Sequence, residues 1–190
     1  MFVDRARVVT DDSGMRIALG LLLVCGCSDS SPTILNDAAP DAFDTNRCLI
    51  MGDYGALGSL TGTRGMTATA TTATMTLDPG PPRDTFFVKL EPNRGVFAAG
   101  VMPGTYTIGG VDAGFATCGL CVHIVADIVS GVGPTKFYFA DTGSVTLTST
   151  TTPVTGSAQN IHLREVDISS GEFVTNGCEA TIASVAFTTN

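Results

Sequence analysis

Hydrophobic and polar residues alternate along much of the chain from residue 46 onward. Phe86, Val88 and Leu90 fall on one side of an extended chain, and Phe87 and Lys89 fall on the other. A period of two is the pattern of a β-strand, whose successive side chains point to opposite faces. The pattern therefore predicts a strand with these two faces.

The same alternation recurs further along the chain. Val122, Ile124 and Ala126 share one face, and His123 and Asp127 lie on the opposite one. Four strand residues span about 13 Å, so His123 and Asp127 are too far apart to bind one metal ion directly. We expect both to be solvated residues of a strand face.

Two β-rich runs, 135–140 and 144–148, flank the tripeptide Asp141-Thr142-Gly143. The tripeptide predicts a hairpin turn, because glycine readily adopts a positive φ. It also resembles the motif of aspartic proteases, whose chemistry needs two carboxylates that share a proton. The sequence contains no second copy of this motif. We therefore interpret Asp141 as a turn residue.

A later apolar run changes its alternation. Ile161 and Leu163 share one parity, and Val166 has the other. A β-bulge near Arg164 and Glu165 would return the apolar residues to one side of the strand.

About eight or nine such runs follow one another along residues 46–190. This spacing predicts a single all-β domain, either an antiparallel β-sandwich or a barrel-like fold. With 44% hydrophobic and 15% charged residues, the composition excludes wholesale disorder.

The N-terminal part has a different character. Met15-Arg16 precedes an apolar run of about ten residues, which is the order of a signal peptide and is too short for a membrane-spanning helix. We expect translation to start at Met15, with residues 1–14 a mis-assigned extension and 15–26 the signal peptide.

The stretch from Leu23 to Cys27 resembles the lipobox of bacterial lipoproteins. The resemblance implies cleavage after Gly26 and acylation of Cys27 by palmitate-type chains, with Cys25 a poorer candidate. Ser28 implies transport to the outer membrane. The partner implied is membrane lipid.

Residues 27–45 are small, polar and acidic, so they predict a flexible tether between the lipidated cysteine and the β domain. The domain itself resembles uncharacterised secreted lipoproteins of the myxobacterial type. The segments that carry this resemblance are TCGLCV at 117–122, FYFADTGSVTL at 137–147 and LREV at 163–166. It brings no known activity.

Four cysteines follow the tether: Cys48, Cys118, Cys121 and Cys178. In an exported chain an even number indicates disulfides, with three possible pairings. We favour Cys118 with Cys121 and Cys48 with Cys178.

The Cys-Gly-Leu-Cys spacing also has the form of a thiol-redox motif. Redox sites place this motif at a helix N-terminus, whereas a β-branched, alternating run follows it here. Four-cysteine zinc sites often show two such pairs, and this chain has one. We expect no metal and no cofactor.

The charge pattern narrows the function classes. The net charge is −8 with ten Lys and Arg residues, which disfavours nucleic-acid binding. The lack of Trp and the three Tyr residues disfavour a carbohydrate-stacking platform. The sequence predicts a non-catalytic structural or binding domain, with an extracellular or envelope protein as a possible partner. The alternative is a secreted hydrolase or thiol-redox protein.

Overall fold

The computed structural model describes residues 53–78 and 83–190. All described residues belong to one compact unit. The predicted segments 1–14, 15–26 and 27–45 lie outside the described residues. The elements are β1 (Ala56–Met66), β2 (Thr71–Asp78), β3 (Arg83–Leu90), η2 (Gly95–Phe97), β4 (Gly104–Ile108), η3 (Gly110–Ala113), β5 (Leu120–Ile128), β6 (Lys136–Ser149), β7 (Thr155–Asp167), β8 (Glu172–Phe173) and β9 (Glu179–Thr189).

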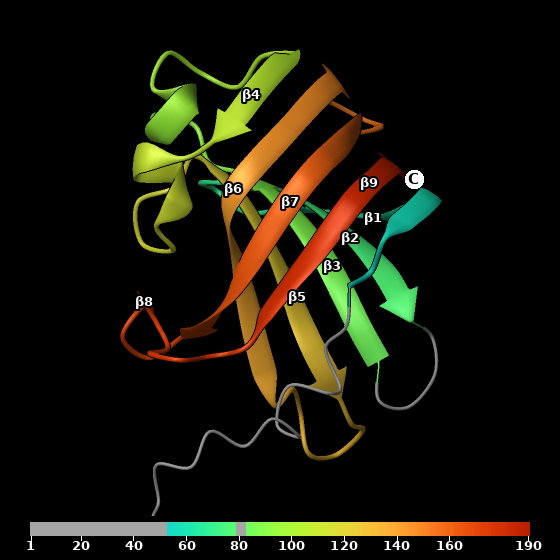
Figure 1. The fold of residues 1–190 in the computed structure, drawn as a ribbon. Helices are drawn as coiled ribbons and strands as arrows, with labels where there is room; N and C mark the ends of the chain where they lie inside the picture. Colours follow the sequence, from blue (N-terminus) through green and yellow to red (C-terminus); the bar gives the residue numbers. More distant parts are fainter. Residues whose placement is uncertain (1–52, 79–82) are drawn as a thin grey trace, which may run out of the picture. The chain divides into compact units, whose positions relative to one another are not determined.

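Seven strands form a closed barrel in the order β6-β5-β3-β2-β1-β9-β7, and pairing of β7 with β6 closes the ring. β4 pairs with β6, and β8 pairs with β7 (Figure 1). The predicted all-β fold of eight or nine strands is confirmed, and of its two forms the structure is the barrel. The expectation of antiparallel pairing is wrong for β1 and β9, which are parallel. No hairpin joins these two strands, which are the first and last in the described chain, so their relative direction is not fixed by a turn.

The barrel interior is filled by apolar side chains, as expected for a barrel of this size. Phe86, Val88 and Leu90 of β3 are buried, whereas Phe87 and Lys89 are partly exposed on the outer side. The two faces predicted for this strand are therefore confirmed. Other strands supply further core residues: Met75, Val122, Ile124, Ala126, Tyr138, Ile161, Leu163 and Ile182.

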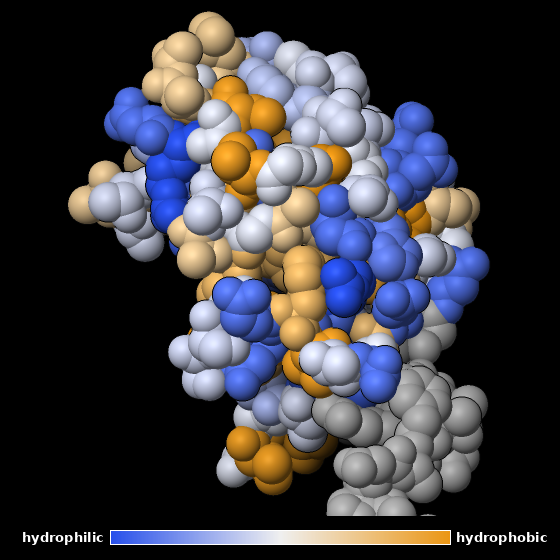
Figure 2. All heavy atoms as spheres, turned by 60° about the vertical axis from the view of Figure 1, so that its left-hand side comes forward, coloured by the Kyte–Doolittle hydropathy of each residue, from blue (hydrophilic) through white to orange (hydrophobic). Residues whose placement is uncertain are grey.

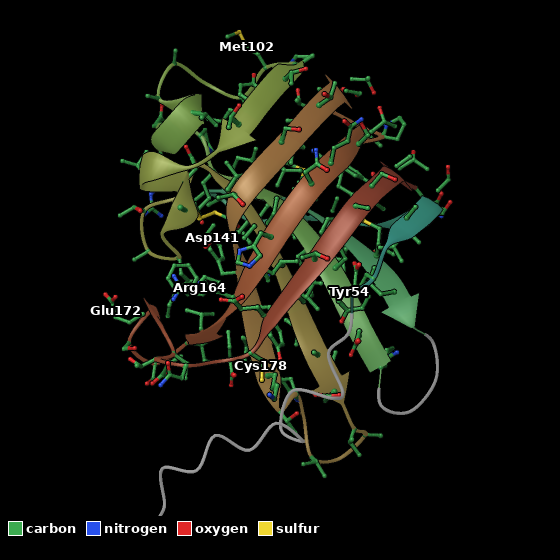
Figure 3. All side chains as sticks on the ribbon, in the orientation of Figure 1. Tyr54, Met102, Asp141, Arg164, Glu172 and Cys178 are labelled. Atoms are coloured by element: carbon green, nitrogen blue, oxygen red, sulfur yellow. A yellow bond between two sulfur atoms is a disulfide. The ribbon has the colours of Figure 1, made fainter. Side chains whose placement is uncertain are left out.

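β6 continues through Asp141, so the predicted hairpin turn is wrong. Asp141 lies partway along the strand (Figure 3). The register with β7 shifts on both sides of Thr142, so the tripeptide forms an irregularity within a long strand. Gly143 has a φ of 133°. A Cβ there would lie 2.5 Å from the Cδ1 of Ile161, so the close approach of β7 requires glycine.

The bulge predicted near Arg164 is also wrong, because the register of β7 with β6 and β9 does not shift there. The alternation simply continues, which places Glu165 inside the barrel. Its carboxylate accepts a hydrogen bond of 2.9 Å from the N–H of Cys178 and lies 3.8 Å from the Nζ of Lys136. Val166 faces the outer side and joins a second apolar cluster there.

Asp127 is buried rather than solvated, which corrects the prediction for this residue. It adopts a φ of 55°, which interrupts the alternation of β5 near its end. Its N–H donates a hydrogen bond of 2.9 Å to Asp84, and its carboxylate accepts one of 3.2 Å from Thr135. Desolvation raises the pKa of Asp127.

Residues 91–119 connect β3 to β5 and contain η2, β4 and η3; we call them the wall segment. Figure 1 shows their helical turns beside the upper part of β6. The end of the wall segment contributes to the second apolar cluster on the outer side of the barrel. Its buried members are Cys118, Cys121, Phe139 and Val166.

Candidate ligand-binding site

A cavity of about 400 Å³ lies between the wall segment and the outer face of the barrel; we call it the outer-wall pocket. β2, β3, β5 and β6 form its floor, and the wall segment forms its side. The lining residues are Thr72, Phe87, Lys89, Glu91, Arg94, Phe115, Ala116, Cys118, Cys121, His123 and Phe139. Figure 2 turns the side of the molecule that carries the wall segment toward the viewer and shows apolar tan side chains between groups of polar blue ones.

Aromatic rings make up much of the floor. Phe87 of β3 and His123 of β5 are register partners, and their rings stack at a centroid distance of 4.7 Å with an interplanar angle of 4°. His123 is in turn the register partner of Phe139 on β6. Phe115 of the wall segment meets Phe139 edge to face at 5.6 Å. Phe139 is fully buried, so the aromatic surface that a ligand can contact comes from Phe87, His123 and Phe115.

The buried carboxylate of Asp112 holds the wall segment in place. It accepts hydrogen bonds from the backbone N–H groups of Val96 at 2.9 Å, Gly119 at 2.7 Å and Leu120 at 3.0 Å. These three groups belong to η2, the end of the wall segment and the start of β5. A Cβ at Gly95 would lie 2.1 Å from the same carboxylate, so this glycine permits the close contact.

A disulfide joins Cys118 to Cys121, as the sequence predicts. Both residues are buried and line the pocket, so the bridge fixes the end of the wall segment to β5. Cys48 lies outside the described residues, and its pairing with Cys178 stays a prediction. Cys178 is buried, with its sulfur 2.9 Å from the Nζ of Lys136.

Charged residues lie at the edge of the pocket. The carboxylate of Glu91 pairs with both Lys89 and Arg94, and the guanidinium also donates a hydrogen bond to the carbonyl of Ala116. Partial burial alone would raise the pKa of Glu91, but the hydrogen bonds and charges of the two cations outweigh it and lower the pKa. Two positive groups thus share one carboxylate.

His123 is a largely enclosed residue rather than the solvated one expected. Burial, together with a smaller effect of the nearby charge of Lys89, lowers its pKa to about 4. The imidazole is therefore neutral at pH 7. Its Nδ1 is buried and has no hydrogen-bond partner within the part of the chain that the structure describes.

The second histidine, His162, belongs to a separate polar group. Its Nδ1 lies 2.7 Å from Asp141 and its Nε2 lies 3.4 Å from Glu179. These two contacts link β6, β7 and β9 on the outer face. The hydrogen bond with Asp141 raises the pKa of His162, against a smaller opposing effect of desolvation.

The structure gives His123 and Asp127, which the sequence raised as ligands of one metal ion, separate surroundings. His123 lies in the outer-wall pocket, His162 bonds to Asp141, and Asp127 bonds to Thr135. Within residues 53–78 and 83–190, no group of three or more His, Cys, Asp or Glu side chains could hold a metal ion.

The outer-wall pocket was not predicted from the sequence. The one indication in the sequence was Phe87, which shares the outward face of a strand with Lys89. A large aromatic ring on an outer face suggests that another part of the chain packs over it. The cover comes from residues nearly thirty positions later in the chain, such as Phe115.

Comparison of the chain with protein-family models, with curated proteins and with solved structures finds no match. In the described part of the chain, no helix has the length and apolar character needed to cross a membrane.

Proposed function

We propose that this chain is an exported bacterial lipoprotein whose barrel domain binds a small ligand, without catalysis, in the outer-wall pocket. The observation that carries the proposal is the pocket itself. Its volume of about 400 Å³ falls within the range of small-molecule sites, and its lining combines aromatic rings with a few charged groups at the edge.

Two features support export. The order of Met15-Arg16, the apolar run and Cys27 is that of a lipoprotein signal. The Cys118–Cys121 disulfide suits an oxidising compartment. Acyl chains on Cys27 would anchor the protein to the outer membrane, with residues 27–45 as the tether.

The contacts that the candidate reactive groups make in the fold favour binding over catalysis. Asp112 accepts three backbone hydrogen bonds, which is a structural task. Cys118 and Cys121 are buried in a disulfide, whereas thiol-exchange enzymes keep a reactive sulfur accessible. Asp141 pairs with a histidine, whereas the aspartic-protease reaction needs a second carboxylate sharing its proton.

The proposal is tested with the neutral aromatic dye N-phenyl-1-naphthylamine, whose fluorescence rises in apolar sites. The purified exported protein should bind it, and Ala116→Trp, which fills the pocket from its wall, should abolish binding. Ala98→Trp, at an exposed position of the wall segment outside the lining, is the matched control and should bind normally. No binding by the wild type, or equal binding by both variants, would contradict the proposed site.

A further inference from the structure

The charges at the edge of the outer-wall pocket are unbalanced. Lys89 and Arg94 both pair with Glu91, so three charged lining residues carry a net charge of +1. The whole chain carries −8. A local excess of positive charge in an acidic protein favours an anionic ligand at this position and repels a cationic one.

The guanidinium of Arg94 has capacity left for a ligand. It has five N–H donors, and its two described hydrogen bonds go to Glu91 and to the carbonyl of Ala116. The side chain of Arg94 is 43% exposed and that of Lys89 is 37% exposed. A ligand carboxylate can therefore reach both cations without displacing Glu91.

His123 supplies a neutral donor at the floor. A neutral imidazole carries one N–H, and its buried Nδ1 has no partner among the described residues. Because an unpaired buried N–H costs more than an unpaired acceptor, the proton belongs on Nε2. The ring then contributes one hydrogen-bond donor beside the aromatic ring of Phe87.

The aromatic rings of the pocket favour a flat, apolar ligand body, and the two cations favour a negatively charged group on it. Aromatic faces also attract cations, but Lys89 and Arg94 would repel a positively charged ligand in this pocket. A neutral aromatic ligand would leave the excess charge without a partner.

We infer that the ligand of the outer-wall pocket is a planar aromatic carboxylate, whose ring packs against Phe87, His123 and Phe115 and whose carboxylate binds Lys89 and Arg94. This inference rests on the proposed function, since it names the chemistry of the same site.

The test uses the purified exported protein and displacement of bound N-phenyl-1-naphthylamine. The competitors are 2-naphthoate, its neutral analogue 2-naphthamide and the cation 2-naphthylmethylammonium. Because the chain contains no Trp, the fluorescence of the dye is read without an indole background. We expect 2-naphthoate to bind at least about fivefold more tightly than the amide, and the cation to bind most weakly.

Lys89→Gln and Arg94→Gln should each remove most of the preference of the pocket for 2-naphthoate over 2-naphthamide. Arg83→Gln, an exposed cation of the same strand outside the pocket, is the matched control and should keep the preference. If the dye binds but 2-naphthoate and 2-naphthamide compete equally, or the cation competes best, the inference is wrong and the proposed binding site stands. If the dye does not bind the wild type, the proposed function fails, and the inference fails with it.

Discussion

Phe87 and His123 face each other across the β3–β5 pair with their rings stacked almost parallel, at a centroid distance of 4.7 Å. The stack lies on the outer side of the barrel, where an uncovered strand face would be solvated. The wall segment covers it, and this cover both encloses the imidazole and creates the pocket. The acid–base behaviour of His123 therefore reports on whether the wall is in place.

Replacing His123 should change how the stability of the protein depends on pH. The pKa of His123 is about 4 in the folded state, below its unfolded value of 6.5. Between these values the unfolded state binds more protons, so stability falls as pH falls from 6.5 to 4, by up to about 3 kcal/mol. His123→Phe keeps an aromatic ring and should lose this part of the pH dependence, measured by urea unfolding at pH 7, 5.5 and 4. An unchanged pH profile would mean that His123 is solvated.

The contribution of His162 to stability should depend on pH in the opposite direction. Its pKa is raised by the hydrogen bond with Asp141, so its contribution to stability is fully present below the unfolded pKa and is lost as pH rises through the folded one. His162→Gln should therefore destabilise the protein more at pH 5.5 than at pH 9. Since the pair is partly exposed and screened, the difference should be less than about 1 kcal/mol. Equal losses of stability at the two pH values would show that the charge of His162 does not contribute.

Asp112→Asn should loosen the wall segment. An amide offers one acceptor oxygen and places an NH₂ group toward backbone donors, so the N–H groups of Val96, Gly119 and Leu120 can no longer all be paired. We expect a loss of about 2 kcal/mol in the free energy of unfolding and at least tenfold weaker binding of N-phenyl-1-naphthylamine. Asp167→Asn, at the exposed end of β7, is the matched control and should change binding little. Normal dye binding by the Asp112 variant would show that the wall does not depend on this carboxylate.

Much of the barrel follows from local pattern. The alternation around Phe86 is enough to assign both faces of β3, because each face has one kind of environment along the strand. The bridge between Cys118 and Cys121 follows from their short spacing in a chain that we propose to be exported.

Other features depend on distant partners. Asp-Thr-Gly is suited to a turn, but β6 continues because both β4 and β7 pair with its second half. Glu165 breaks the expected apolar parity because Lys136 and the backbone of Cys178 are available inside the barrel. The pocket joins four strands to a separate connecting segment, so no single stretch of sequence encodes it.

The proposed lipid anchor is tested by metabolic labelling with palmitate in a bacterial host. Cys27→Ala should abolish labelling, because Cys27 is the residue preceded by the small Gly26 in the lipobox-like stretch. Cys25→Ala, two residues away, is the matched control and should still be labelled. Labelling that survives in Cys27→Ala and disappears in Cys25→Ala would place the cleavage site two residues earlier than proposed.

The most direct test of the binding site is an amide NMR titration of the isotopically labelled protein with N-phenyl-1-naphthylamine. The largest shifts should occur at Phe87, Ala116 and His123, which line the outer-wall pocket. Ser157 and Ala186, which line shallow hollows over β7 and β9, should not shift. Shifts concentrated at Ser157 and Ala186, or no shifts at saturating dye, would contradict the account.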